Sequence, residues 1–432
     1  MAAERKDALY LGVDVGTNGV RVAAIDGEGR ALVQAAHAMD LPCRQGLRIE
    51  QDPGLWWSTL AHLLDELAGR IDIGRIRRIA VDGTSGTLLL ADAAGRPKSP
   101  GVMYNDARGG AAAERIAGAA PPESGAHGPT SALARLMTLL ADGIAPDVRH
   151  VLHQADWIAG RLAGVFGISD ENNALKMGYD PVERRWPGWL DELGVPRGLL
   201  PEVRAPGMPI GPIDPAMARR FGFSPAAEVC CGTTDGTAAF IATGAAEIGD
   251  AVTSLGSTLV VKLLAGRPIF DPDIGVYSHR LGERWLVGGA SNTGGAALLA
   301  HFTAERMAEL TPLLEPDRPT GLRFYPLPAK GERFPIRDPE MTGAIADRPA
   351  DDARFLQGLL EGIAQVEALA YRRLAELEAP APRRVLTVGG GARNAAWTRI
   401  RARALGVPVL VAGQTEAAYG AALLALRGGG PP

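Results

Sequence analysis

An aspartate in the second half of the chain follows an apolar segment and stands between small polar residues. Residues 234–240 read TDGTAAF, and Asp235 comes shortly after Val229, Cys230 and Cys231. A carboxylate at the end of a strand can cap a turn, or it can accept a proton from a substrate hydroxyl. Asp235 is therefore a candidate general base, with a turn residue as the alternative.

Three glycine-rich turns have the composition of phosphate-binding loops. They are DVGTNGVR (14–21), LGSTL (255–259) and VGGGARN (388–394). Glycine lets backbone N–H groups converge on an anion, hydroxyls add donors, and a following helix start contributes partial positive charge. Each turn alone is equally typical of a tight hairpin. Three of them beside predicted strands favour phosphate binding.

The chain contains no GxxxxGK[ST] sequence, and GGGARN does not fit GxGxxG, so neither of these nucleotide-binding motifs is present. Asp14 lies inside the first turn. A carboxylate there repels phosphate unless a cation such as Mg²⁺ lies between them, whereas the alternative is that Asp14 only caps the turn.

Several segments together resemble the FGGY carbohydrate kinases, in the family's order and over nearly the whole chain. They are residues 14–17, 50–57, 232–235, 255–258, 331–333, 389–394 and 416–422. Within that family, residues 153–181 resemble most closely the short D-ribulose kinases of cyanobacteria and plants.

The resemblance implies an α/β fold of two actin-like (ribonuclease H-like) ATPase domains with a ligand cleft between them. Residues 1–228 would form the sugar-side domain, and residues 229–432 the ATP-side domain with the catalytic base. The implied reaction is in-line transfer from ATP to a pentulose, D-ribulose to D-ribulose 5-phosphate, with D-xylulose as the alternative. An alternative of another class is an actin-like ATP-binding sugar sensor without kinase turnover.

The resemblance also implies roles for individual residues. Asp235 would be the general base, and Asp14 would hold Mg²⁺ through water. The sugar would contact Asp14, Asn18, Gly19, Val20, Arg21, Ser85, Gly86, Asp106 and Asp235. ATP would contact Gly16, Thr17, Gly256, Ser257, Thr258, Gly294, Gly390, Gly391, Ala392, Arg393 and Asn394.

The sugar pocket departs from two related patterns. In glycerol kinases the turn matching residues 84–86 presents Arg-Glu, and in bacterial xylulose kinases it presents Met-His, whereas here it reads Thr-Ser-Gly. Small residues leave room and supply a hydroxyl and amides, which argues against glycerol and puts xylulose in doubt. Asp82 and Asp106 are candidates for binding sugar hydroxyls, with a turn or structural role as the alternative.

Hydrophobic periodicity predicts the elements that position these residues. We expect a hairpin or meander at 8–32, a strand–turn–strand at 76–97, and the opening theme again at 228–266. We expect a loop-like segment at 196–215. Alternation of strands and helices near the C-terminus predicts a mainly parallel sheet covered by helices, and the repeated theme predicts two related α/β domains. Helices are expected at 55–67, 131–140, 154–162, 352–378, 395–405 and 415–426, with strands at 383–388 and 407–412.

Composition sets the class of protein. The chain has 432 residues, 46% hydrophobic and 22% charged, with a net charge of −4 and scattered basic residues. We expect two or three domains and no partner of nucleic acid or membrane, in a monomer or homodimer. Three cysteines without CxxC spacing predict neither disulfides nor a zinc site, which fits a cytoplasmic protein. His150 and His153 lack a third metal ligand, and Trp56 and Trp57 are expected to pack.

Overall fold

The computed structural model describes residues 7–428, which form two compact units. Of the described residues, the first unit contains 7–242, His279–Gly282 and 416–428. The second contains Thr243–Ser278 and Glu283–Thr415. These units differ from the expected division at residue 228, because residues 229–242 and the C-terminal helix join the first unit. No helix among the described residues is long and apolar enough to cross a membrane.

The first unit is built on a mixed sheet with the strand order β12-β13-β6-β1-β2-β3. Strands β13, β6 and β1 are parallel, whereas β2, β3 and β12 pair antiparallel with their neighbours. The predicted opening meander is confirmed as β1 to β3. The strands are β1 (Leu9–Val15), β2 (Gly19–Asp26), β3 (Ala31–Ala38), β6 (Ile76–Gly83), β12 (Pro209–Pro212) and β13 (Glu228–Thr234).

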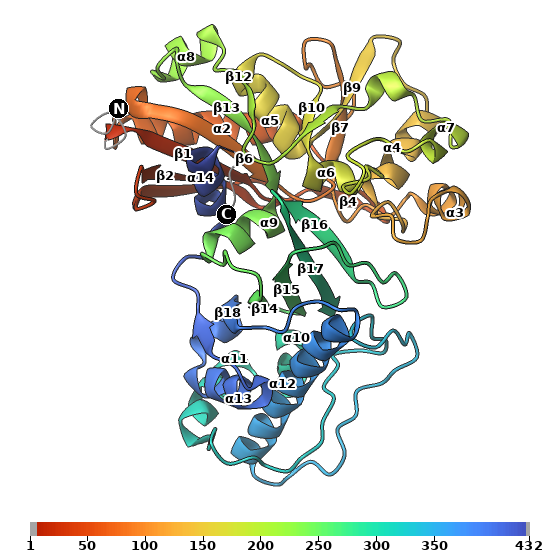
Figure 1. Cartoon of the computed structure of the whole chain (residues 1–432), viewed down its shortest axis with the longest axis vertical. Coiled ribbons are helices and arrows are strands. Elements are labelled where there is room, and N and C mark those ends of the chain that lie inside the picture. Colours follow the sequence, from red (N-terminus) through yellow and green to blue (C-terminus); the bar gives the residue numbers. More distant parts are fainter. Residues whose placement is uncertain (1–6, 429–432) are drawn as a thin grey trace. The chain divides into compact units, whose positions relative to one another are not determined.

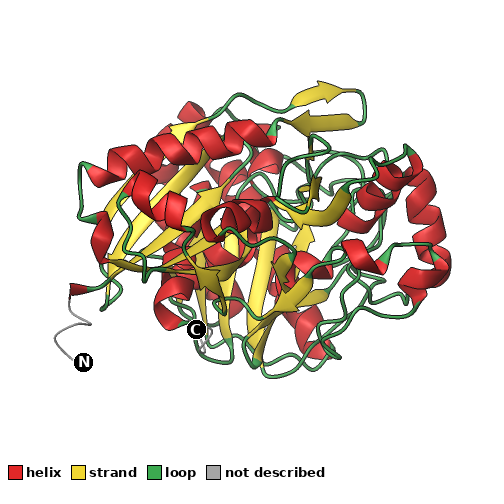
Figure 2. Ribbon diagram, turned by 90° about the horizontal axis from the view of Figure 1, so that it is seen from above, coloured by secondary structure: helices red, strands yellow, loops and turns green. Residues whose placement is uncertain are grey.

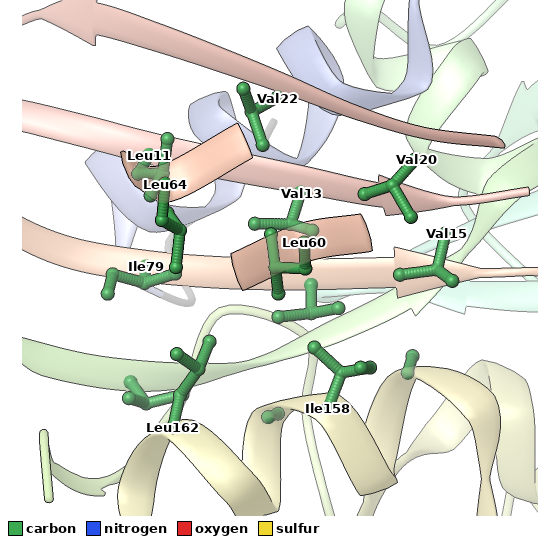
Figure 3. Close-up of a cluster of buried hydrophobic side chains, with 14 of the residues drawn as sticks. Leu11, Val13, Val15, Val20, Val22, Leu60, Leu64, Ile79, Ile158 and Leu162 are labelled. Carbon is green, nitrogen blue, oxygen red and sulfur yellow. The ribbon is translucent and has the colours of Figure 1, made fainter. Parts of the chain in front are cut away.

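Helices cover both faces of this sheet. On one face, α2 (Pro53–Ala68) and α5 (Gln154–Ala163) bury their leucines and isoleucines against the apolar side chains of β1, β2 and β6 (Figure 3). On the other face, α14 (Ala417–Arg427) lies beside β1 although the whole chain separates them (Figure 1). Gly12 permits this contact, because a Cβ there would lie 1.9 Å from the backbone oxygen of Ala418.

Smaller elements of the first unit surround this sheet. Strands β4 (Cys43–Gln45), β5 (Arg48–Gln51), β8 (Gly101–Val102), β7 (Leu88–Asp92) and β9 (Val148–His153) form a second sheet, and β10 (Ile168–Asp170) pairs with β11 (Glu202–Arg204). The helices are α3 (Gly110–Ala119), α4 (Ala132–Ala141), α6 (Glu171–Leu175), α7 (Trp189–Glu192), α8 (Pro215–Phe221) and α9 (Asp235–Ala242), with 3₁₀ turns at Ile73–Arg75 and Arg197–Leu199.

The second unit repeats the strand arrangement of the first. Its sheet has the order β16-β17-β15-β14-β18-β19, in which β14, β18 and β19 are parallel and β14, β15 and β17 form an antiparallel meander. The strands are β14 (Asp250–Leu255), β15 (Leu259–Ala265), β17 (Arg284–Ser291), β18 (Arg384–Val388) and β19 (Val409–Val411), with β16 (Tyr277–Leu281), of which only Tyr277 and Ser278 belong to the second unit. The helices are α10 (Gly295–Leu299), α11 (Ala304–Leu310), α12 (Asp352–Glu376) and α13 (Ala395–Leu405), with 3₁₀ turns at Thr311–Leu313 and Gly390–Arg393.

The predicted helices are confirmed to within a few residues, and helices pack on both sides of the strands (Figure 2). The structure corrects two expectations. The sheets are mixed rather than mainly parallel, because each begins with an antiparallel meander. The segment 196–215 is not only loop, since it contains β11 and the edge strand β12, whose two prolines lower its strand signal.

Trp56 packs as expected, fully buried against Trp157 with its Nε1 2.7 Å from Gln51 Oε1.

Candidate active site

Four polar residues lie in one row across the central sheet of the first unit. The strand register pairs Asp14 on β1 with Arg21 on β2 and with Asp82 on β6, and it pairs Asp82 with Thr233 on β13. Side chains alternate along a strand, so partners in register point to the same face. Leu11, Val13 and Val15 belong to the core under α2 and α5, which leaves Asp14 on the face of α14.

Asp14 is almost completely buried and lies in an acidic environment. Its Oδ2 is 3.1 Å from Nη1 of Arg21, and Nε of Arg21 is 3.6 Å from Oε2 of Glu416, the residue before α14. Burial raises the pKa of Asp14 above its usual range, although hydrogen bonds with Asp82 and Arg21 act in the opposite direction. Arg21 therefore links the strand carboxylate to the start of the C-terminal helix.

Asp82 is fully buried, and no N–H or O–H group of another described residue donates to its carboxylate oxygens. Burial raises the pKa of Asp82 well above its usual range, and the charges of Asp14 and Asp235 add to this shift. In its protonated form Asp82 can donate to Asp14, which satisfies both groups. Burial of two adjacent carboxyl groups therefore disfavours ionisation of both at once, and a bound cation would favour it.

Asp235 is the first residue of α9 and directly follows β13. Its Oδ1 accepts a hydrogen bond of 2.7 Å from the N–H of Gly236, and its negative charge contributes to the raised pKa of Asp82. The ends of β1, β6 and β13 lie side by side, because Val15 pairs with Gly83 and Gly83 with Thr234. Ligands of open α/β sheets bind at this carboxyl edge. The structure thus brings Asp14, Asp82 and Asp235 together at one edge.

The first glycine-rich turn connects β1 to β2 at the same edge. The N–H of Gly16 donates to the oxygen of Gly19 at 3.0 Å, and Gln51 Nε2 donates to the oxygen of Thr17 at 3.3 Å. A Cβ at Gly19 would lie 2.4 Å from the oxygen of His37, so the turn packs too closely for a side chain. Among the residues predicted to contact the sugar, Val20 places its side chain in the apolar core, on the opposite face of the sheet from Asp14.

Asp106 is fully buried and has both carboxylate oxygens engaged. Oδ2 accepts from the N–H of Ile49 at 2.7 Å, and Nε of Arg108 lies 3.0–3.1 Å from both oxygens. Arg108 also donates to Glu50 at 2.7 Å. These contacts favour the structural alternative for Asp106, whose role in sugar binding stays a prediction.

The second and third glycine-rich turns meet in the second unit. The turn Gly256–Thr258 connects β14 to β15, and Gly389 follows β18, the parallel neighbour of β14. Gly389 has a φ of 85°, and a Cβ there would lie 2.7 Å from the oxygen of Leu255. Gly294 has a φ of 135°, and the next residue, Gly295, donates its N–H to the oxygen of Gly256 at 2.8 Å.

A cavity of about 730 Å³ lies beside these turns, within the second unit. Its lining combines residues of the glycine turns with a larger set of apolar side chains. Of the predicted ATP-binding residues, Gly256, Ser257, Gly390, Gly391, Arg393 and Asn394 line it, whereas Thr258, Gly294, Ala392 and, in the first unit, Gly16 and Thr17 do not. Asn394 also caps α13, because its Oδ1 accepts from the N–H of Trp397 at 3.0 Å. The apolar wall of the cavity includes Leu298, Leu299, Met307, Leu356, Leu360 and Trp397.

Sequence reasoning missed several residues near these sites. Arg135 contacts the turn that holds Ser85 and Gly86, and Glu416 contacts Arg21. The apolar wall of the cavity carries no motif, because its residues look like ordinary helix core.

His153 contacts Asp156 at 3.0 Å, and no cluster of three or more metal-ligating side chains occurs within residues 7–428.

Family models match the chain in two parts. A model of the FGGY family of carbohydrate kinases, N-terminal domain, matches residues 9–124, and the corresponding C-terminal domain model matches residues 251–428. The chain belongs to the FGGY family of carbohydrate kinases. It is a sugar kinase.

Relatives of this FGGY kinase with known names include xylulose kinases. The chain is 24% identical over 443 residues to a xylulose kinase of Escherichia coli (strain K12), covering 96% of this chain and 89% of the relative. It is 27% identical over 426 residues to a xylulose kinase of Streptomyces rubiginosus, covering 93% of this chain and 84% of the relative.

Solved structures of the family share the fold of two actin-like (ribonuclease H-like) domains. A crystal structure of a xyloylose kinase from Brucella ovis superposes with a TM-score of 0.87 at 25% identity, covering 98% of this chain and 90% of that one. A glycerol kinase of Plasmodium falciparum with ADP gives a TM-score of 0.83 at 15% identity, covering 96% and 88% of the two chains. The second likeness shows the fold alone.

Proposed function

We propose that this FGGY kinase transfers the terminal phosphoryl group of ATP directly to a pentulose, with D-ribulose as the substrate and D-ribulose 5-phosphate as the product. The observation that carries the proposal is the group of Asp14, Asp82 and Asp235 at the carboxyl edge of the first sheet. A carboxylate at the start of α9 is suited to accept the proton of a sugar hydroxyl.

In the proposed reaction, Asp235 is the general base. The 5-hydroxyl oxygen of the sugar forms a bond to the γ-phosphorus, and the bond from that phosphorus to the bridging oxygen of ADP breaks. The hydroxyl proton passes to the carboxylate of Asp235. Catalysis of phosphoryl transfer is mainly positioning and charge neutralisation, so one correctly placed acceptor is sufficient.

We assign most ATP contacts to the second unit and the sugar to the first, and Gly16 and Thr17 of the first unit stay predicted ATP contacts. The cavity beside Gly256, Ser257 and Gly390 supports the ATP assignment, because it combines backbone donors for phosphates with an apolar wall suited to a base. Residues 229–242, which include Asp235, then belong to the unit that binds the sugar. We also propose a cytoplasmic location, where ATP is available, and a monomer or homodimer.

The acidic pair fits a magnesium ion. Mg²⁺ in kinases is usually held by one or two carboxylates together with substrate phosphates and water. Asp14 would hold it through water, and the two oxygens of Asp82 that receive no donor from another described residue could accept from that hydration shell. When bound, the ion would neutralise the charge that develops on the transferred group.

The choice of D-ribulose rests on the turn of residues 84–86. Its small residues differ from the Met-His pair that the resemblance gives for bacterial xylulose kinases. D-xylulose is the second candidate, because relatives of this chain are xylulose kinases.

A substrate panel tests the proposal. The purified protein is supplied with ATP and Mg²⁺, and ADP release is measured with D-ribulose, D-xylulose, other pentuloses, erythritol, gluconate and glycerol. We expect the highest kcat/KM with D-ribulose. A higher value with D-xylulose would contradict the substrate, and no sugar-dependent ADP release from any compound would contradict pentulose kinase activity.

A further inference from the structure

Two turns of the first unit meet close to the acidic edge of its sheet. The turn at residues 84–87 follows β6, and the turn at 103–106 follows β8. The N–H of Tyr104 donates to Thr87 Oγ1 at 3.1 Å, and Thr87 Oγ1 lies 2.6 Å from Thr84 Oγ1. Gly83, which precedes the first turn, pairs with Val15 and Thr234. Both turns are therefore near the edge that carries Asp235.

Arg135 of α4 holds the two turns together. Its Nη2 donates to the oxygen of Gly86 at 2.6 Å, and its Nη1 donates to the oxygen of Met103 at 2.9 Å. The side chain is only 2% exposed. Burial lowers the pKa of Arg135 to about 10, so the group remains charged at neutral pH. One planar guanidinium with fixed donor directions sets the spacing of the two backbone oxygens.

Arg135 also explains why residue 86 is glycine. A Cβ at Gly86 would lie 2.7 Å from Nη2 of Arg135, and Gly86 has a φ of 86°. The expectation that the small residues of this turn leave room is therefore corrected at Gly86, because the guanidinium fills that space. What the turn offers a ligand is the side chain of Ser85.

Two buried polar atoms on these turns have no hydrogen-bond partner among the described residues. They are Oγ of Ser85 and Oδ1 of Asn105. Leaving a buried polar atom without a hydrogen-bond partner is unfavourable. Ser85 adjoins Gly86, and Asn105 is two residues from Met103, so Arg135 fixes the backbone next to both atoms. A hydroxyl-rich ligand would satisfy both.

We propose that Asn105 is a further sugar-binding residue, which accepts a hydrogen bond from a pentulose hydroxyl through Oδ1 beside Ser85. Arg135 is the positioning residue that holds the two turns at the spacing the sugar requires. This inference rests on the proposed pentulose kinase function and adds a specificity determinant to it.

The test compares Asn105→Ala, Arg135→Lys and the control Arg161→Lys. Arg161 is a second arginine of the same unit, which stacks 4.2 Å from the centre of the Trp57 ring and not on the turns. Steady-state kinetics give KM and kcat for the pentulose that the wild type uses, and calorimetry gives the Kd of the sugar and of ADP. Circular dichroism confirms that each variant is folded.

We expect Asn105→Ala to raise the Kd and KM of the sugar about 10- to 100-fold, with the Kd of ADP unchanged. Arg135→Lys should raise the sugar KM by a similar factor, because an ammonium lacks the planar fork that holds both turns. The kcat at saturating sugar should stay within a few-fold of the wild-type value. Arg161→Lys should change neither constant.

Unchanged sugar binding in Asn105→Ala would overturn the role of Asn105. An equal loss of sugar and ADP binding in Arg135→Lys, or a loss of stability alone, would overturn the positioning role. If Arg135→Lys does not fold, Asn105→Ala still decides the sugar contact. A wild type that binds no pentulose would overturn the proposed function, and this inference with it.

Discussion

At the scale of single residues, the contacts of each buried acid indicate what it can do, because burial alone does not distinguish Asp14, Asp82 and Asp106. Asp14 and Asp82 are neighbours in register, and Asp235 begins the helix after the next strand. From the sequence, Asp106 was as good a candidate as Asp82 for binding sugar hydroxyls, yet Ile49 and Arg108 occupy its oxygens. Sequence identifies the acids, but only the contacts show that neighbouring residues engage both carboxylate oxygens of Asp106.

Asp170 provides a pH test at this scale. Burial, together with the charge of Asp156, raises the pKa of Asp170 to about 7, whereas an unfolded aspartate titrates near 3.9. The folded state therefore binds the proton more tightly, and stability present below about pH 4 is lost as the pH rises towards 7. A pKa shift of this size corresponds to up to about 4 kcal/mol of folding free energy.

We expect Asp170→Asn to remove this part of the pH dependence, because the amide oxygen can still cap α6 through the N–H groups of Asn172 and Asn173. Urea unfolding at pH 5 and pH 8 measures it: the wild type should lose more stability between these values than the variant. Equal losses would show that Asp170 is ionised in the folded protein.

At the scale of elements, a buried polar network connects the strands that carry the two glycine turns of the cavity. Arg401 of α13 contacts Glu367 of α12 through bonds of 2.6 and 2.7 Å, and it donates to Thr387 of β18 at 2.6 Å. Glu367 in turn accepts from Thr253 of β14 at 2.5 Å. Thr253 and Thr387 each precede a turn by two or three residues, so the network fixes both turns.

We expect Arg401→Met to destabilise the protein by about 3–5 kcal/mol, because it leaves Glu367 buried without its cation. The matched control is Arg399→Met on the same helix, whose exposed pair with Asp317 is worth less than about 1 kcal/mol. Urea unfolding compares the two variants. A similar small loss in both would contradict a structural role for the network.

At the scale of the whole molecule, the sequence predicts the repeated theme but not the assignment of every segment. Two apolar runs separated by a glycine-rich turn predicted the opening meander, periodic leucines predicted α2, and a long helical pattern predicted α12. The return of α14 to the first unit was not predicted, because nothing local records which sheet a helix packs on. Its contact depends on Gly12 and on the small residues Ala418 and Ala422.

The same limit applies to the sites. The glycine turns and Asp235 carry local signals of composition and position, so they were found from the sequence. Arg135 and Asn105 were missed because their roles depend on contacts between distant segments: Arg135 reaches the oxygen of Gly86, 49 residues away. The apolar wall of the cavity was missed because buried leucines look alike wherever they pack.

The substitution Asp235→Asn tests most directly whether Asp235 accepts the proton of the sugar. An amide keeps the size of the side chain but cannot accept that proton, so kcat should fall about 10²- to 10⁴-fold while the Kd values of sugar and ADP change little. Asp65→Asn, at an exposed acid paired with Arg220, is the control and should keep wild-type kcat. Turnover by Asp235→Asn close to that of the wild type would contradict a general-base role for Asp235.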